Sequence, residues 1–178
     1  RSFEVVSAYA EPFTLTVVAD LEGVPEADHA LFRDHRVRKI YEAIAPCKPA
    51  LQWPPGGVLR RESRIGASAH FMQQAEVPGQ PNAVTDIRLV EVLPSPANAA
   101  PTLARYELQP VTGQRHQLRV HMNALGLPIL NDGIYPVLSP EGAPDHSKPL
   151  QLLARSLEFV DPVTSQPCRF VSGRTLIC

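Results

Sequence analysis

The chain has 178 residues, of which 44% are hydrophobic and 20% charged, and its 17 Lys and Arg against 18 Asp and Glu leave a formal net charge of -1. This balance is typical of a globular domain and excludes a strongly basic protein that coats nucleic acid without specificity. No apolar run approaches the roughly 18 residues of a membrane span, and the N-terminus shows no secretory signal, so we expect a cytoplasmic protein without membrane contact.

The three cysteines, Cys47, Cys168 and Cys178, are an odd number without CxxC spacing. We therefore expect neither a disulfide framework nor a structural zinc site. The 19 prolines occur in many short clusters, which we predict to be loops between short elements rather than one disordered tail.

The first part of the chain predicts a strand, a helix and a second strand. Alternating β-branched residues favour a strand over 13–18, and a proline in the first turn, with acids early and bases late, favours a helix over 25–35. A strand over 38–44 would place Tyr41 on one face and Glu42 on the other.

The remainder predicts two strand pairs separated by one helix. The pairs are 84–93 with 103–108 and 156–160 with 168–171, and the helix runs from about 114 to 125, with Gly126 placed as its C-cap. This order favours an α+β fold in a single domain over 1–178, with a mixed, largely antiparallel sheet, flanking helices and Pro-rich loops.

The densest polar segment is 112–121, TGQRHQLRVH. Arg115 and Arg119 lie four residues apart, so both would leave one face of the predicted helix near its start. Two such cations repel each other unless a phosphate or carboxylate lies between them. A solvated charged helix face explains the spacing equally well. His116 and His121 do not share a face, so we expect core or surface histidines rather than a metal site.

A second basic segment precedes the predicted strand at 38–44. Arg36, Arg38 and Lys39 lead to Tyr41, an order that suits phosphate contact followed by stacking of a base on the tyrosine. The alternative is a solvated helix end, with Tyr41 as an ordinary core aromatic.

Residues 106–136 read YELQPVTGQRHQLRVHMNALGLPILNDGIYP. This segment closely resembles the third motif of RluA-type pseudouridine synthases, which reads TGRTHQIRVH, a small-to-apolar helix, LGHPI and GDxxY. Residues 32–44 resemble the second motif of that family, and 152–162 resemble its closing motif. The resemblance covers roughly 25–172 and implies a pseudouridine synthase-like fold.

Three departures from the family pattern stand out as tolerable changes. Gln114 and Arg115 occupy the places of an Arg-Thr pair, Asn131 replaces the glycine before Asp132, and Leu153 replaces a histidine of the closing motif.

A larger departure is the lack of the first motif, a His-Arg-Leu-Asp-type turn that carries the nucleophilic aspartate. Asp20 has neither the preceding His-Arg nor the following Thr-Ser-Gly of that motif. We therefore expect an internal segment to be missing near 16–23, and no carboxylate within salt-bridge reach of Arg119. In a continuous chain, an acid such as Asp20 would approach Arg119 instead.

The resemblance implies an enzyme that flips a uridine out of ribosomal or transfer RNA, detaches the base through an aspartate and rejoins it through carbon. No redox change or added group is needed, so no cofactor and no metal are implied. Arg119 would pair with the nucleophilic aspartate and keep it ionised by lowering its pKa, and Tyr41 would line the base pocket. The residues expected to contact RNA are Arg36, Arg38, Lys39, Arg115 and His116. We expect a monomer.

Two other classes of function stay open. One is a catalytically inactive RNA-binding protein on the same scaffold. The other is a small-molecule hydrolase that uses Ser63, Ser68 or His70, although the sequence has no GxSxG nucleophile elbow to support it, and no P-loop or GxGxxG motif either.

Overall fold

The computed structural model of the protein describes residues 37–48, 51–55, 57–70, 72–94, 101–139, 147–161 and 164–176. The predicted strand over 13–18, the predicted helix over 25–35, and the expected break near 16–23 lie outside these residues. So do Asp20 and Arg36. Within the described ranges, no helix has the length and hydropathy needed to cross a membrane.

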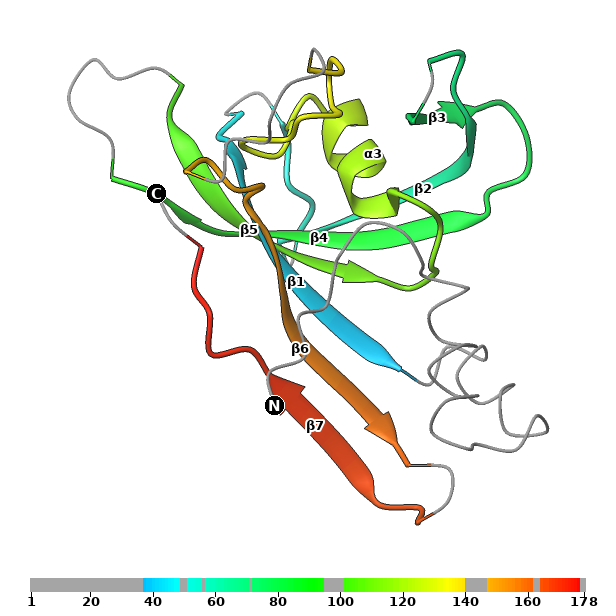
Figure 1. Cartoon of the computed structure of the whole chain (residues 1–178), viewed down its shortest axis with the longest axis vertical. Helices are drawn as coiled ribbons and strands as arrows, with labels where there is room; N and C mark the ends of the chain where they lie inside the picture. The colour runs from blue at the N-terminus through cyan, green and yellow to red at the C-terminus, as the bar shows by residue number, and fades with distance from the viewer. Residues whose placement is uncertain are drawn as a thin grey trace.

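A seven-stranded sheet forms the body of the fold, with the spatial order β3-β2-β4-β5-β1-β6-β7 (Figure 1). The strands are β1 (Arg38–Pro46), β2 (Val58–Ala67), β3 (Gln74–Val77), β4 (Ala83–Val92), β5 (Leu103–Pro110), β6 (Leu152–Val160) and β7 (Pro167–Val171). All neighbouring strands pair antiparallel, which confirms the predicted α+β class with a largely antiparallel sheet.

The sequence predicted β1, β4, β5, β6 and β7, together with the pairings of β4 with β5 and of β6 with β7. It did not predict β2 or β3. In β2 the period-2 alternation is masked by charge, because Arg61 and Ser63 share a face with Leu59 and Ile65. A strand face that carries polar partners gives little hydrophobic signal.

One helix, α3 (Gln117–Ala124), lies on one face of the sheet and packs against β2, β3, β4 and β5 (Figure 1). It begins later than the predicted residue 114 because His116 adopts a left-handed conformation with φ 58°. It ends as predicted at Gly126, where φ is 73°. The N–H of Gly126 donates to the Asn123 carbonyl and that of Leu127 to the Met122 carbonyl, both at 2.9 Å, the hydrogen bonds of a Schellman motif.

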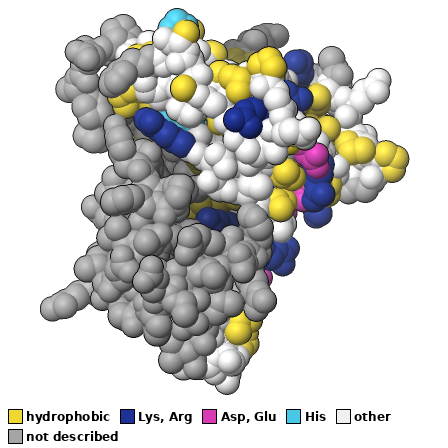
Figure 2. Space-filling view, turned by 90° about the vertical axis from the view of Figure 1, so that its right-hand side faces the viewer, with side chains coloured by type: hydrophobic (Ala, Val, Ile, Leu, Met, Phe, Trp, Pro, Cys, Tyr) yellow, Lys and Arg dark blue, Asp and Glu magenta, His cyan; other side chains and the backbone are white. Residues whose placement is uncertain are grey.

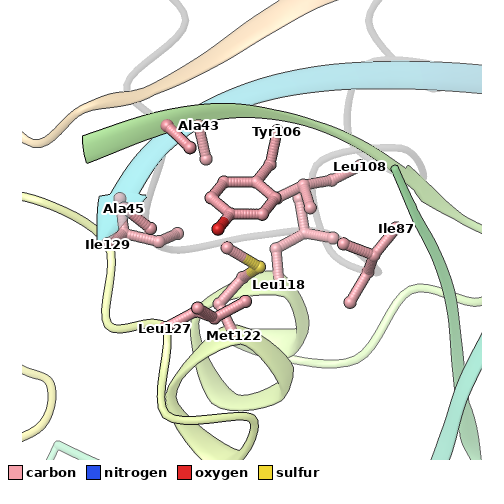
Figure 3. Close-up of a cluster of buried hydrophobic side chains, with 10 residues drawn as sticks. Ala43, Ala45, Ile87, Tyr106, Leu108, Leu118, Met122, Leu127 and Ile129 are labelled. Carbon is pink, nitrogen blue, oxygen red and sulfur yellow. The ribbon is translucent and has the colours of Figure 1, made fainter. Parts of the chain in front are cut away.

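The main core lies between α3 and the centre of the sheet. Alternate residues of β1, β4 and β5 point at the helix, and side chains of α3 and the segment after it fill the other side (Figure 3). The labelled members are Ala43, Ala45, Ile87, Tyr106, Leu108, Leu118, Met122, Leu127 and Ile129. The Tyr106 hydroxyl donates to the Pro46 carbonyl at 3.0 Å, so its one polar atom is paired inside this core.

Candidate active site

The start of α3 is fixed to the sheet by one buried side chain, that of Gln117. Its Oε1 accepts from the Thr112 hydroxyl (2.8 Å) and the Gln114 N–H (2.9 Å), and its Nε2 donates to the Val84 carbonyl and the Thr85 hydroxyl (both 2.9 Å). These bonds satisfy the amide fully on the donor side and hold the first turn of the helix against β4. The side chain two residues later, Arg119, therefore leaves the helix in a fixed direction.

Arg119 points at Asp132 in the segment that follows α3. Its Nε donates to Oδ2 at 2.8 Å and its Nη2 to Oδ1 at 2.5 Å, with only 11% of the arginine side chain and 0% of the aspartate side chain exposed. Oδ1 also accepts the backbone N–H groups of Ile134 (2.8 Å) and Tyr135 (3.1 Å). Asp132 is thus held by its own turn as well as by the arginine.

The expectation that no carboxylate would reach Arg119 is wrong. Among the described residues its partner is Asp132, thirteen positions further along the same motif. Gly126 turns the chain at the end of α3 and the following segment returns along the helix, so the two side chains meet. Sequence reasoning looked for the partner in another motif and overlooked the acid within this one.

Tyr135 covers Arg119 and connects it to β3. The guanidinium carbon lies 5.3 Å from the centre of the tyrosine ring, within the range of a cation–π contact. The tyrosine hydroxyl accepts the Gln74 N–H at 2.7 Å and donates to the Gln74 carbonyl at 3.2 Å. It also lies 3.1 Å from Nδ1 of His116, whose ring meets the tyrosine ring edge-on.

Burial changes the pKa values of two of these side chains, His116 and Tyr135. Burial, followed by the charges of Arg119 and Arg115, lowers the pKa of His116 to about 4. Burial also raises the pKa of Tyr135. Both side chains are therefore neutral at pH 7.

A second polar cluster lies under α3, where the fully buried His121 faces β2 and β4. Its Nδ1 is 2.9 Å from the Thr85 hydroxyl and its Nε2 is 3.0 Å from the Ser63 hydroxyl. Glu76 lies 4.0 Å from Nε2 and is itself paired with Arg61. Burial lowers the pKa of His121 to about 4, so this is a neutral core histidine, one of the two alternatives that the sequence left open.

Tyr41 lies on the α3 side of β1, beside an irregularity. The register of β1 with β6 shifts between Ile40 and Tyr41, because Arg155 is an extra residue in β6 at this point. Half-buried Tyr41 packs against the core cluster that includes Leu118, the residue before Arg119. Glu42 points to the opposite face, where it accepts from Arg155. The predicted alternation of this strand is confirmed.

The other predicted RNA contacts differ in their surroundings. Arg115 is exposed in the turn before α3, so the prediction that it shares a helix face with Arg119 is wrong. Exposed Arg38 lies 3.6 Å from Glu158, and Lys39 is half-buried. Figure 2 shows several Lys and Arg side chains on the described part of one face, some separated by uncharged side chains and some beside Asp or Glu. The Lys and Arg side chains drawn in colour on this face are therefore spread out rather than gathered in one patch.

The departure from the family glycine before Asp132 has a structural explanation. Asn131 adopts φ 61°, in the left-handed region that glycine and asparagine enter most readily. Asparagine can therefore take the place of glycine in the turn that presents Asp132. In the part of the chain that the structure describes, no group of three or more His, Cys, Asp or Glu side chains is arranged to hold a metal ion.

Comparison with known proteins gives one family and one fold. Residues 24–124 match the family model described as RNA pseudouridylate synthase. The dual-specificity RNA pseudouridine synthase RluA of Salmonella typhi is 44% identical over 92 residues, which are 52% of this chain and 37% of that protein. The protein of the same name from Escherichia coli strain K12 is 51% identical over 63 residues, 35% of this chain and 25% of that protein. The chain thus spans about a third of the curated relatives it matches.

Two solved structures share the fold. Human RNA Pseudouridylate Synthase Domain Containing 1 superposes with a TM-score of 0.58 at 22% identity, over 85% of this chain and 62% of that one. Human RNA Pseudouridylate Synthase Domain Containing 4 superposes with a TM-score of 0.55 at 23% identity, over 86% of this chain and 64% of that one. At these identities the likeness concerns the fold, and it confirms the pseudouridine synthase-like architecture expected from the motifs.

Proposed function

The chain belongs to the RNA pseudouridylate synthase family, and from this membership we propose that the protein isomerises a uridine in RNA to pseudouridine. The observation that carries the proposal is the setting of Arg119. It is a nearly buried arginine, fixed by two hydrogen bonds, at the place where the chain matches the arginine motif of the family. The helix that carries it lies on the face of the sheet to which Tyr41 also belongs.

The reaction breaks the bond between N1 of uracil and C1′ of the ribose and forms a bond between C5 and C1′. The C5 hydrogen leaves as a proton and N1 regains one, so atoms balance without a cofactor. An aspartate begins the reaction in the family, and a neighbouring arginine favours its ionised form by lowering its pKa. Arg119 would serve this carboxylate, and Tyr41 would stack on the flipped base.

Asp132 is unsuited to the role of the nucleophile. Its side chain has no exposed surface, Oδ1 accepts three hydrogen bonds, and Oδ2 accepts one from Arg119. A carboxylate engaged in this way has few lone pairs left to offer. We therefore propose that the nucleophilic aspartate belongs to a segment of the complete protein that joins this chain near 16–23, within one catalytic domain. An intact mass well above 19.5 kDa supports this proposal, and a mass of 19.5 kDa contradicts it.

The substrate we propose is a uridine in ribosomal RNA, with transfer RNA as the second choice, and the proposed setting is a cytoplasmic monomer. The proposed backbone contacts are Arg36, Arg38, Lys39, Arg115 and His116. Exposed Arg115 supports this assignment, since it lies in the turn that leads into α3.

The test is replacement of Arg119 by alanine in the complete protein. We expect Arg119→Ala to abolish release of the C5 hydrogen from tritiated uridine in RNA, while the Kd for RNA stays within about threefold of wild type. The matched control is Arg88→Ala, which removes an exposed cation from β4. Near-normal turnover by Arg119→Ala would show that this arginine has no part in the chemistry. RNA binding by a wild-type protein that forms no pseudouridine would favour the inactive RNA-binding alternative.

A further inference from the structure

We propose that Asp132 is the positioning residue for Arg119, a role that rests on the proposed function. Asp132 binds only one edge of the Arg119 guanidinium. Asp132 takes Nε and Nη2, the two nitrogens along one edge of the guanidinium. Nη1, at the other corner, has no hydrogen-bond partner among the described residues. Because a guanidinium is planar and rigid, fixing one edge also fixes the direction of the remaining N–H groups.

The Asp132 carboxylate is itself held in place in the absence of substrate. Oδ1 of Asp132 accepts two backbone N–H groups of its own turn, those of Ile134 and Tyr135. The Tyr135 ring covers the guanidinium, and its hydroxyl is tied to the backbone of Gln74 on β3. Thus α3 carries the arginine, the 131–135 turn binds it, and β3 holds the tyrosine that covers it. A group fixed in this way loses little freedom when a reacting carboxylate approaches it.

Stability alone is a poor explanation of this arrangement. Desolvation of two buried charges offsets much of their attraction, so an apolar pair of similar size often stabilises a fold as well. Only 11% of the Arg119 side chain and 0% of the Asp132 side chain are exposed, so that cost applies here. What an apolar pair cannot supply is a cation pointed in a set direction. Orientation is therefore the role that the geometry assigns to Asp132.

The experiment compares Asp132→Asn with wild type in the complete protein. The amide keeps the size of the side chain but turns one acceptor toward Arg119 into a donor. We expect single-turnover isomerisation at saturating RNA to fall about 100-fold, the effect of a misplacement of order 1 Å, with the Kd for RNA within about threefold. In ¹⁵N NMR of wild type we expect the Nε–H of Arg119, assigned by its absence in Arg119→Lys, to exchange slowly with solvent, and we expect Asp132→Asn to lose this protection.

The matched control is Asp86→Asn. Asp86 makes the same two-bonded pair with Arg60, at 2.7 and 2.8 Å, on the sheet face that does not carry α3. It should leave the rate and the Arg119 signal unchanged. If Asp132→Asn does not fold, Asp132→Glu replaces it. That variant keeps the charge but displaces it by one methylene, and we expect at least a tenfold loss of rate with unchanged binding.

A wild-type rate in Asp132→Asn, or in Asp132→Glu where the amide does not fold, overturns the inference. A wild-type protein that forms no pseudouridine in RNA contradicts the proposed function instead. In that case the NMR signal alone decides the positioning role. Loss of protection in Asp132→Asn but not in Asp86→Asn supports it, and retention in both overturns it.

Discussion

At the scale of single residues, the site is made of side chains that hold one another. Arg119 and Arg115 are four positions apart, yet one is paired in the interior and the other is exposed before the helix. Two arginines near the start of the same helix therefore differ in burial and in pairing, and they need not share a role. A buried, oriented arginine suits the reacting atoms, whereas an exposed one suits the phosphate backbone.

Tyr41 offers a test of base stacking at this scale. Tyr41→Phe keeps the aromatic ring and loses the hydroxyl, whereas Tyr41→Ala loses both. We expect the alanine variant to bind RNA more weakly than the phenylalanine variant by roughly 1–3 kcal/mol, the value of one stacked base. Equilibrium titration with RNA that contains the target uridine measures the difference. Equal affinities would mean that Tyr41 serves only the core against which it packs.

His121 gives a prediction on pH. Its pKa is about 4 in the folded protein against an ordinary value of 6.5, because burial disfavours its charged form. The unfolded chain therefore takes up a proton near pH 6.5 that the folded chain refuses, and stability falls as the pH drops from 6.5 toward 4. Between pH 7 and 5 this histidine should lower the free energy of unfolding by about 2 kcal/mol.

Urea unfolding at pH 7, 6 and 5 measures this dependence. We expect His121→Gln to remove about 2 kcal/mol of it, and His70→Gln, at an exposed position, to leave it unchanged. The window avoids the acids Glu42, Glu76 and Asp86, whose pKa values lie below the ordinary carboxyl range and whose contribution is lost only at lower pH. Identical pH profiles for both variants would contradict the buried, neutral state of His121.

At the scale of elements, specific contacts at both ends of α3 determine where this short helix begins and ends. Left-handed His116 begins it, the buried amide of Gln117 ties it to β4, and the Schellman motif at Gly126 ends it. The Lys48 ammonium donates to the Leu125 carbonyl at 3.2 Å, a favourable place for a cation at a helix C-terminus. These ends determine where the chain turns back after α3. They therefore also determine the position of Asp132.

Substitution of Gly126 tests whether the C-terminal end of α3 determines the position of Asp132. Its φ of +73° strains any residue with a side chain, and an added Cβ would lie 2.7 Å from Nζ of Lys48. We expect Gly126→Ala to lower the free energy of unfolding by about 1–2 kcal/mol. If the turn also shifts Asp132, the single-turnover rate should fall with it.

Two other glycines distinguish the backbone strain at Gly126 from the clash of an added Cβ with Lys48. Gly57 has a similar φ of +71° with nothing within 4 Å of an added Cβ, so Gly57→Ala measures the backbone strain alone. Gly173 has open space and no positive φ, and Gly173→Ala should change stability by less than about 0.5 kcal/mol. A loss in Gly126→Ala no larger than in Gly173→Ala would contradict the account of the helix end.

At the scale of the whole molecule, the near-neutral net charge means that the proposed binding of RNA depends on local exposed cations. The formal charge is -1. The helix α3 covers one face of the sheet and not the other. Ile87 of β4 lies in the core under α3, so the adjacent Arg88 lies on the other face. Arg115 and Arg88 are thus two exposed cations on different sides of the sheet.

Salt dependence of RNA binding distinguishes these two sides. We expect Arg115→Ala to weaken binding for all sequences alike and to reduce the slope of log Kd against log salt concentration by about 0.7–0.9, the value of one phosphate contact. Arg88→Ala should leave the slope unchanged. A slope reduced by Arg88→Ala but not by Arg115→Ala would place the RNA on the opposite face.

The sequence by itself determined those features whose signal is local. Alternating hydrophobic residues marked β1 and β4 to β7, since one buried face repeats every second residue. Gly126 marked the end of the helix because few other residues adopt its φ. The motif over 106–136 indicated the family, which the match over 24–124 then bore out.

Only the tertiary structure decided which polar groups meet. The partner of Arg119, the burial of His121 between Thr85 and Ser63, and the polar face of β2 all join residues from separate elements. A hydrophobic pattern reports that a face is buried, but it does not report which donor lies opposite which acceptor. That depends on where the chain turns and in which register the strands pair, and these distances exist only once the fold has formed.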